Sequence, residues 1–179
     1  KNISRDFSSS KSTREEHFRK FKEDNKERIR LCSFSERNDS LLMWSHYADS
    51  HKGITLEYDV SKNDKIGAYL EPVYYTNKMF DITPFFGKSK DMLPVKMAAI
   101  TKAEDWQYEK EWRLTFPIFD GNPNGFYKIG NPVAIYLGAR FEENLLQHKE
   151  TLLKIARKEN IPIYKMDMHN SEFRIIQIK

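Results

Sequence analysis

The chain has 179 residues, the size of one ordinary domain and enough to bury a core without disulfide or metal staples. Its composition, with 39% hydrophobic and 13% aromatic residues, excludes an intrinsically disordered chain. The 30 basic and 26 acidic residues give a net charge of +4, which permits contact with nucleic acid but does not indicate a dedicated nucleic-acid binder.

Cysteine usage and hydropathy bear on the cellular compartment. Cys32 is the only cysteine, so the sequence excludes an internal disulfide and a cysteine-based zinc site, as is typical of a reducing compartment. The sequence has no apolar stretch of about 18 residues, and its first residues do not read as a secretion leader. We therefore expect a cytoplasmic protein with no membrane partner.

The N-terminal part divides into a polar stretch and a helical pattern. Residues 1–13 are polar and serine-rich, which predicts a flexible tail or linker before a single domain over residues 14–179. From Arg14 to Arg30, apolar residues recur at helical spacing among oppositely charged pairs. We expect a helix with a solvated charged face, and the alternative is an arm that binds phosphate.

A strand, a helix and a second strand follow. The strand is expected at Leu31 to Phe34, and the helix from Ser40 to about Ser50, with Asn38 and Asp39 as candidate N-caps. Alternating apolar residues in the segment Ile54 to Asp59 predict a half-buried strand.

The middle of the chain is less regular. We expect a strand around Tyr69 to Thr76 and a long irregular excursion from Asn77 to Pro94, a type of segment that is often functional. A helix around Pro94 to Ala103 has its proline in the first turn. The segment WQYEKEWRLTF then alternates as a strand.

The C-terminal part predicts a strand at Phe126 to Ile129, an apolar strand PVAIYLG, a helix from about Glu142 to Asn160, and closing strands IPIYKM and EFRIIQI. Strands and helices mix along the chain without a regular alternation. We therefore expect an α+β domain with a central mixed, largely antiparallel sheet and flanking helices.

The segment MWSHYADSHKG, residues 43–53, gathers four aromatic or imidazole rings. At helical spacing, Trp44 and Tyr47 fall on the apolar half, so they are expected to be core anchors, whereas His46 falls on the polar half and needs a partner or a cleft. His51 is placed in the turn before the next strand. His46 and His51 are five residues apart, the wrong spacing for one helical face, so we expect no metal site.

The segment WQYEKEWRL presents a second group of polar side chains. Strand periodicity places Glu109, Glu111 and Arg113 on one side and the aromatic residues on the other. This row is consistent with a surface charge ladder. If it lines a cleft, the same groups can stabilise a developing positive charge and orient a leaving group.

Three segments, CSFSERNDSLLMWSHYADSHKGITLEYD, WQYEKEWRL and PVAIYLGARF, together resemble the motifs of the bacterial family catalogued as domain of unknown function 2971. The resemblance implies an intracellular bacterial protein. Members of that family usually begin with a further N-terminal segment, with an Asn-Asp-Pro-x-x-Glu motif, that we do not find here. The matching positions are Cys32, Phe34, Ser35, Met43, Trp44, His46, Tyr47, Ala48, Gly53, Trp106, Glu109, Glu111, Arg113 and Gly138.

One functional hypothesis is enzymatic. A glutamate pair on a strand is similar to the layout of ADP-ribosyltransferases, which use NAD and pass through an oxocarbenium-like state that a carboxylate stabilises. On this hypothesis Glu111 stabilises that state and Glu109 orients the acceptor. On the same hypothesis, His46 and Arg113 contact ribose or phosphate. Ser35, Trp44 and Tyr47 are the candidate substrate-binding residues.

The alternative hypothesis is a non-catalytic binding or sensor module, serving in defence against phage or in stress. Here Trp44, His46, Glu111 and Arg113 form a buried polar network that holds the fold. A nuclease or other hydrolase is a third interpretation, which the lack of a recognisable metal-ligand motif weakens. The decisive observation is whether His46, Glu111 and Arg113 converge in an open cleft or in dry core.

Overall fold

The computed structural model describes residues 15–16, 19–20, 22–23, 29–62, 64–81, 83–85, 92–117, 129–143 and 146–178. The tail expected at residues 1–13 lies outside these ranges, as does the expected strand from Phe126 except for Ile129, which is not in a strand. The described residues of the expected first helix, 15–16, 19–20 and 22–23, are helical. Its expected end is wrong, because Ile29 and Arg30 already belong to a strand.

The first sheet has the order β1-β6-β3, with both pairings antiparallel. Its strands are β1 (Ile29–Ser35), β6 (Glu111–Pro117) and β3 (Leu70–Pro72). Leu114, in the central strand, is 1% exposed. We call this sheet A.

The second sheet, sheet B, has the order β2-β7-β8-β9. Its strands are β2 (Ile54–Glu57), β7 (Ala134–Leu137), β8 (Ile163–Met168) and β9 (Ile175–Ile178). Strand β7 is buried along its whole length, which explains the unbroken apolar run that predicted it. The pair β7 and β8 is parallel, and helix α5 (Leu146–Lys158) lies between them in sequence.

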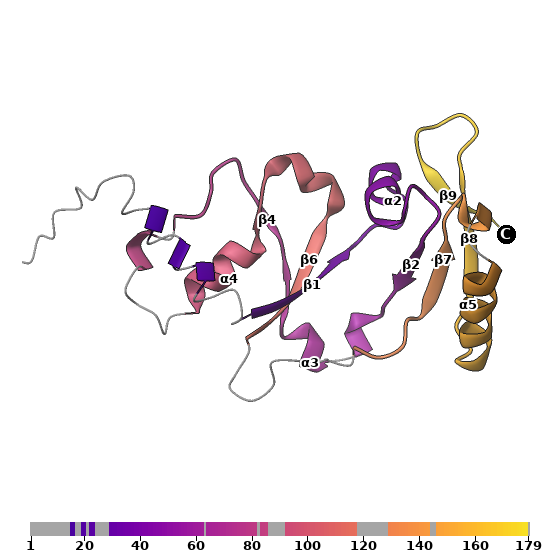
Figure 1. The fold of residues 1–179 in the computed structure, drawn as a ribbon, viewed down its shortest axis with the longest axis horizontal. Helices are drawn as coiled ribbons and strands as arrows, with labels where there is room; N and C mark the ends of the chain where they lie inside the picture. The colour runs from indigo at the N-terminus through magenta and orange to yellow at the C-terminus, as the bar shows by residue number, and fades with distance from the viewer. Residues whose placement is uncertain are drawn as a thin grey trace, which may run out of the picture.

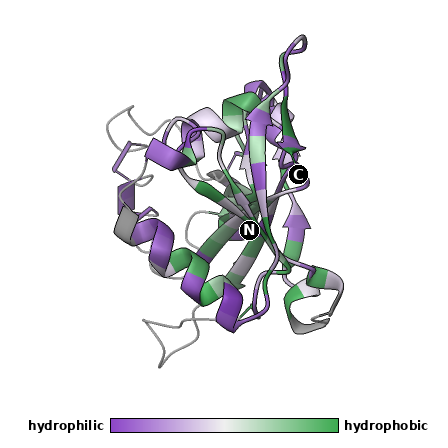
Figure 2. Cartoon of the chain, turned by 90° about the vertical axis from the view of Figure 1, so that its right-hand side faces the viewer, coloured by the Kyte–Doolittle hydropathy of each residue, from purple (hydrophilic) through white to green (hydrophobic). Residues whose placement is uncertain are grey.

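Helices cover both faces of sheet B (Figure 1). Ala134 and Tyr136 pack with Trp44 on one face, whereas Ile135 and Leu137 pack with Ala156 of α5 on the other. Figure 2 shows that hydrophobic and hydrophilic residues alternate around α5, as is typical of a helix with one buried face. The main core therefore lies on the two sides of β7.

The prediction of one central sheet is wrong, because the described residues form three separate sheets. The third, sheet C, pairs β4 (Tyr74–Tyr75) in parallel with β5 (Thr101–Lys102). The strand expected from Tyr69 to Thr76 is split in two, because β3 pairs with β6 only as far as Pro72 and β4 pairs instead with β5. After the buried Val73, whose N–H donates to the Glu111 carbonyl at 2.9 Å, the chain leaves sheet A for sheet C.

The remaining elements are short. Helix α4 (Leu93–Ile100) confirms the helix expected near Pro94, although its predicted end at Ala103 is too late because β5 begins at Thr101. Among the described residues, no helix is both long and apolar enough to cross a membrane. The other short elements are η1 (Val60–Lys62), α3 (Asp64–Gly67), η2 (Thr83–Phe85), η3 (Glu104–Glu109) and η4 (Phe141–Glu143).

Helix α2 (Leu41–Tyr47) confirms the helix expected from Ser40, but it is shorter at its C-terminal end. Its N-cap is Ser40, whose hydroxyl accepts from the Met43 N–H, so the predicted caps Asn38 and Asp39 are wrong. Helix α2 ends before three consecutive non-glycine residues with positive φ, at 44°, 52° and 69°: Asp49, Ser50 and His51. His51 therefore lies in the turn, as the sequence predicts.

This left-handed turn docks on the end of β7 through Gly138. The Gly138 N–H donates to the Gly53 carbonyl, and the Arg140 N–H donates to the His51 carbonyl, both at 3.0 Å. A Cβ atom at Gly138 would lie 2.1 Å from the His51 carbonyl oxygen. The backbones meet so closely that only glycine fits.

Replacing Gly138 with alanine is therefore expected to lower the free energy of unfolding by about 3 kcal/mol or more, because a backbone carbonyl must move. Urea unfolding measures the loss. Gly67→Ala is the control, because a Cβ atom there meets nothing within 4 Å, and it should change stability by about 0.5 kcal/mol or less. Equal effects of the two substitutions would contradict the docking role of Gly138.

Candidate functional site

A cleft of about 1070 Å³ lies between sheets A and B, with α2 contributing to its wall. The cleft brings together six of the seven residues that the sequence singles out, from β1, α2, η3 and β6: Ser35, Trp44, Tyr47, Glu109, Glu111 and Arg113. The seventh, His46, is not among the described residues that line it. These side chains come from segments far apart in the sequence, so the cleft depends on the whole arrangement of the two sheets.

The two glutamates reach the cleft wall from different elements. The prediction that the strand begins before Glu111 is wrong. Glu109 ends the 3-10 helix η3, and of the two glutamates only Glu111 belongs to β6. Between them Lys110 adopts a left-handed conformation with φ of 45°. Both carboxylates nevertheless meet at one ammonium group, that of Lys102 in β5.

Lys102 is the centre of a buried ion network. Its Nζ lies 2.5 Å from Glu109 Oε2 and 2.9 Å from Glu111 Oε2. The Glu109 and Glu111 residues are 3% and 5% exposed. Two ionised carboxylates at this burial need nearby positive charge, and the Lys102 ammonium supplies it to both.

Arg113 holds the second half of the network. Its Nε and Nη2 donate to the two oxygens of Glu111 at 2.8 and 3.0 Å, which is a bidentate pair. Its Nη1 donates to the Ala99 carbonyl in α4. Arg113 thus fixes the Glu111 carboxylate in place and ties α4 to sheet A.

These contacts shift the pKa of Glu111 strongly. Burial alone would raise it, but hydrogen bonds from Arg113, Ser33 and Lys102 outweigh burial and lower the pKa of Glu111 to about 2. Burial likewise works against the charge on Lys102, but its hydrogen bonds to the two glutamates outweigh burial and raise its pKa. The Glu111 carboxylate is therefore a fixed anion at neutral pH and is not suited to giving or taking a proton.

Tyr47 lies at the open side of the network. The prediction that Tyr47 is a core anchor is wrong, because the residue is 63% exposed. Its hydroxyl donates to Glu109 Oε1 at 2.8 Å, and burial together with this hydrogen bond raises the pKa of Tyr47. An exposed donor thus satisfies the carboxylate oxygen of Glu109 that Lys102 does not hold.

Trp44 confirms the core interpretation. It is 2% exposed, and its Nε1 donates to the Asn38 carbonyl at 2.6 Å. Its neighbour His46 is exposed, and its ring lies 6.2 Å from each of the Tyr47 and Trp106 rings. The predicted meeting of His46 with Glu111 and Arg113 is not among the contacts of the described residues.

Ser35 supports the site through the backbone. Its hydroxyl donates to the Glu109 carbonyl at 2.6 Å and accepts from the Arg37 N–H at 3.0 Å. Ser35 therefore positions the end of η3 against β1.

Sequence reasoning missed Lys102 and Tyr75. The Tyr75 hydroxyl accepts from the Glu111 N–H at 2.7 Å, and Lys102 bridges the glutamates. The sequence predicts Lys102 at the end of a helix, in a chain with many lysines, so no sequence signal distinguishes it. Its role follows only from the parallel pairing of β4 and β5.

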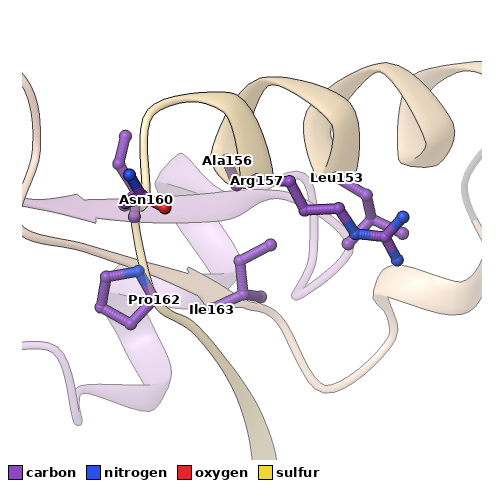
Figure 3. A pocket seen from close by; sticks show the side chains of 7 residues that line it. Leu153, Ala156, Arg157, Asn160, Pro162 and Ile163 are labelled. Carbon is purple, nitrogen blue, oxygen red and sulfur yellow. The ribbon is translucent and has the colours of Figure 1, made fainter.

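Two further features of the described residues do not form competing sites. No group of three or more His, Cys, Asp or Glu side chains in the described ranges is arranged to hold a metal ion. A second hollow, of about 490 Å³, lies where α5 ends and β8 begins, and Figure 3 shows Arg157 and Asn160 among its mainly apolar lining. That hollow has no cluster of ionisable groups comparable to the cleft.

Comparison with known families supports the sequence resemblance over part of the chain. Residues 43–114 match the model of a family described as protein of unknown function (DUF2971). This range contains most of α2, all of η3 and the residues of the ion network. No curated protein and no solved structure matches the chain. The family description names no ligand and no reaction, so it does not support NAD use or ADP-ribosyl transfer.

Replacing Lys102 with methionine should lower the free energy of unfolding by about 3–5 kcal/mol, because it leaves two buried carboxylates facing each other without their shared cation. Chemical denaturation measures the change. Lys158→Met is the matched control: that side chain is 80% exposed, and its ion pair with Glu159 is 3.7 Å long. The control should cost about 1 kcal/mol or less, and a similarly small loss for Lys102→Met would contradict the central role of Lys102.

Acid should weaken the fold through Glu111. The carboxyl takes up a proton near pH 4.5 in the unfolded chain but only near pH 2 in the folded protein, so its stabilising effect is present above pH 4.5 and is lost as the pH falls toward 2. Between pH 4.5 and pH 2, the free energy of unfolding should decrease less steeply with falling pH for Glu111→Gln than for the unchanged protein.

The control for this experiment is Glu150→Gln, at an exposed position of α5, which should keep the original slope. If Glu111→Gln does not fold, titration of the Glu111 carboxyl carbon by NMR in the unchanged protein measures the pKa directly. A midpoint near 4.5 would contradict the fixed-anion interpretation.

Proposed function

We propose that this chain is a small-molecule binding module whose cleft takes a nucleoside-type ligand, meaning an aromatic ring that carries a hydroxylated sugar. The observation that carries the proposal is the hydrogen bond from the exposed Tyr47 hydroxyl to the buried Glu109 carboxylate at the cleft wall. A buried acceptor whose donor belongs to an exposed side chain is suited to exchange that donor for a ligand hydroxyl.

The network has a structural side and a ligand side. Glu111 is held at both oxygens by Arg113 and also by Lys102, so it serves the fold. Glu109 is held at one oxygen by Lys102, and its other oxygen faces Tyr47. A sugar hydroxyl that replaces the Tyr47 hydroxyl keeps the hydrogen bond to Glu109 and frees the Tyr47 ring to cover the ligand.

Aromatic side chains line the rest of the cleft. Phe34 and Tyr58 form an edge-to-face pair with ring centroids 6.0 Å apart, and Trp112 and Tyr136 are also among the lining residues. Such rings bind the faces of a planar base or pyridine ring by stacking. The cleft thus combines a hydroxyl acceptor with aromatic surfaces, which together fit a nucleoside.

A second candidate function is glycosyl transfer from an NAD-type substrate, and the position of Glu109 Oε1 beside the exposed Tyr47 at the cleft wall favours it. Cleavage of a glycosidic bond develops positive charge on the sugar, which a carboxylate stabilises. In this arrangement Glu109, rather than Glu111, is the carboxylate that faces the sugar. A role in phage defence or stress rests on no feature of the cleft and is not part of the proposal.

Calorimetric titration with adenosine, ADP-ribose and NAD tests the binding proposal. At least one should bind, and Glu109→Gln should weaken that binding by about tenfold or more, since a hydrogen bond to a charged group contributes about 1.5–3 kcal/mol. Incubation with NAD, followed by chromatography for released nicotinamide, tests the enzymatic candidate.

Two tyrosines provide a matched control pair. Tyr47 and Tyr74 are both 63% exposed, but only Tyr47 is among the described residues that line the cleft. Tyr47→Phe should therefore change the ligand affinity, whereas Tyr74→Phe should not. Absence of binding by all three compounds, or affinities that neither Tyr47→Phe nor Glu109→Gln alters, would refute the proposal.

A further inference from the structure

Some of the charged side chains that line the cleft pair with an opposite charge, and others do not. Among the described lining residues, four are acidic and three are basic, in a chain whose net charge is +4. Lys102 and Arg113 are committed to the two glutamates of the network. Arg37, the third cation, pairs with Asp39 at 2.8 Å. Each positive charge on the described part of the cleft wall therefore already has an acidic partner.

The two remaining acidic side chains are Glu36 and Glu57, which receive hydrogen bonds from neutral groups. Trp112 Nε1 donates to Glu36 Oε1 at 2.6 Å, and the Tyr136 hydroxyl donates to Glu57 Oε2 at 2.5 Å. The hydrogen bond to Glu57 raises the pKa of Tyr136 to about 12, so Tyr136 stays a neutral donor. Neither of these acidic groups has its charge cancelled by its donor.

Each sheet thus contributes one acidic side chain bonded to one aromatic side chain. Glu36 directly follows β1 and meets Trp112 of β6 in sheet A, whereas Glu57 of β2 meets Tyr136 of β7 in sheet B. All four residues line the cleft. Aromatic faces attract cations, and a carboxylate beside such a face strengthens that attraction.

We infer that the cleft selects a positively charged nucleoside without a phosphate group, such as a riboside of a pyridinium ring. This inference rests on the proposed function and narrows its ligand class. A cationic ring lies favourably among the aromatic side chains and the acidic groups of both sheets. A phosphate group needs an available cation or a bed of free N–H donors, whereas each basic side chain of the described wall already has an acidic partner.

Three compounds of one skeleton test the charge preference by calorimetry at neutral pH. Nicotinamide riboside carries a cationic ring and dihydronicotinamide riboside has a neutral ring. Nicotinamide mononucleotide keeps the cationic ring and adds a phosphate to the ribose. The cationic riboside should bind at least about tenfold more tightly than the neutral one, and the phosphate should weaken binding by a similar factor. Equal affinities, or tighter binding of the mononucleotide, would overturn the inference.

Variants locate the preference in the cleft. Glu57→Gln should bring the affinity ratio of cationic to neutral riboside closer to one. The exposed Glu150→Gln of α5 should keep the original ratio. A ratio that Glu57→Gln and Glu36→Gln both leave unchanged would count against this inference.

An adenosine arm separates the two levels of the argument. If adenosine binds and the three pyridine ribosides do not, the charge inference fails while the nucleoside proposal stands. If adenosine, ADP-ribose, NAD and all three pyridine compounds fail to bind, the proposed function fails. The charge inference then fails with it.

Discussion

The ammonium group of Lys102 is the constraint on which the site depends. It lies between Glu109 and Glu111, two carboxylates that are buried almost completely and need a counter-charge to remain ionised together. Lys102 comes from sheet C, whereas Glu111 comes from sheet A. The ion network therefore does more than satisfy charges, because it fixes the small parallel sheet against the larger antiparallel one and so sets one wall of the cleft.

Unusual backbone conformations occur at the places where this arrangement needs them. Lys110 is left-handed between the two glutamates, and three consecutive left-handed residues, Asp49 to His51, end the segment that carries Tyr47. Non-glycine residues adopt this conformation at a cost of about 1 kcal/mol or more each, so surrounding contacts must hold them there. The ion network supplies such contacts at Lys110, and the docking of the turn on Gly138 supplies them at the second place.

The sequence predicts those parts of the fold that follow from local patterns. The apolar run PVAIYLG, the amphipathic α5 and the core position of Trp44 each have a periodicity or composition that the structure confirms. The division into three sheets was not predictable, because it depends on which distant strands the neighbouring segments β3 and β4 pair with, β6 for the first and β5 for the second. The site shows the same limit: the sequence predicts that Glu111 and Arg113 lie on one strand, but neither the approach of Glu109 from η3 nor the cation between the glutamates was predictable.

On the proposed function, the network is both a scaffold and a binding site, at different atoms. Glu111 has both oxygens held by Arg113 and a depressed pKa, which makes it a fixed part of the wall. Glu109 shares Lys102 with Glu111 but turns its second oxygen to an exposed hydroxyl. Because the ammonium is shared, the proposed function needs the rigid Glu111 side to hold Lys102 in place while a ligand hydroxyl replaces Tyr47 at Glu109. A buried ion network can in this way support the fold at one carboxylate and present an acceptor to a ligand at the next.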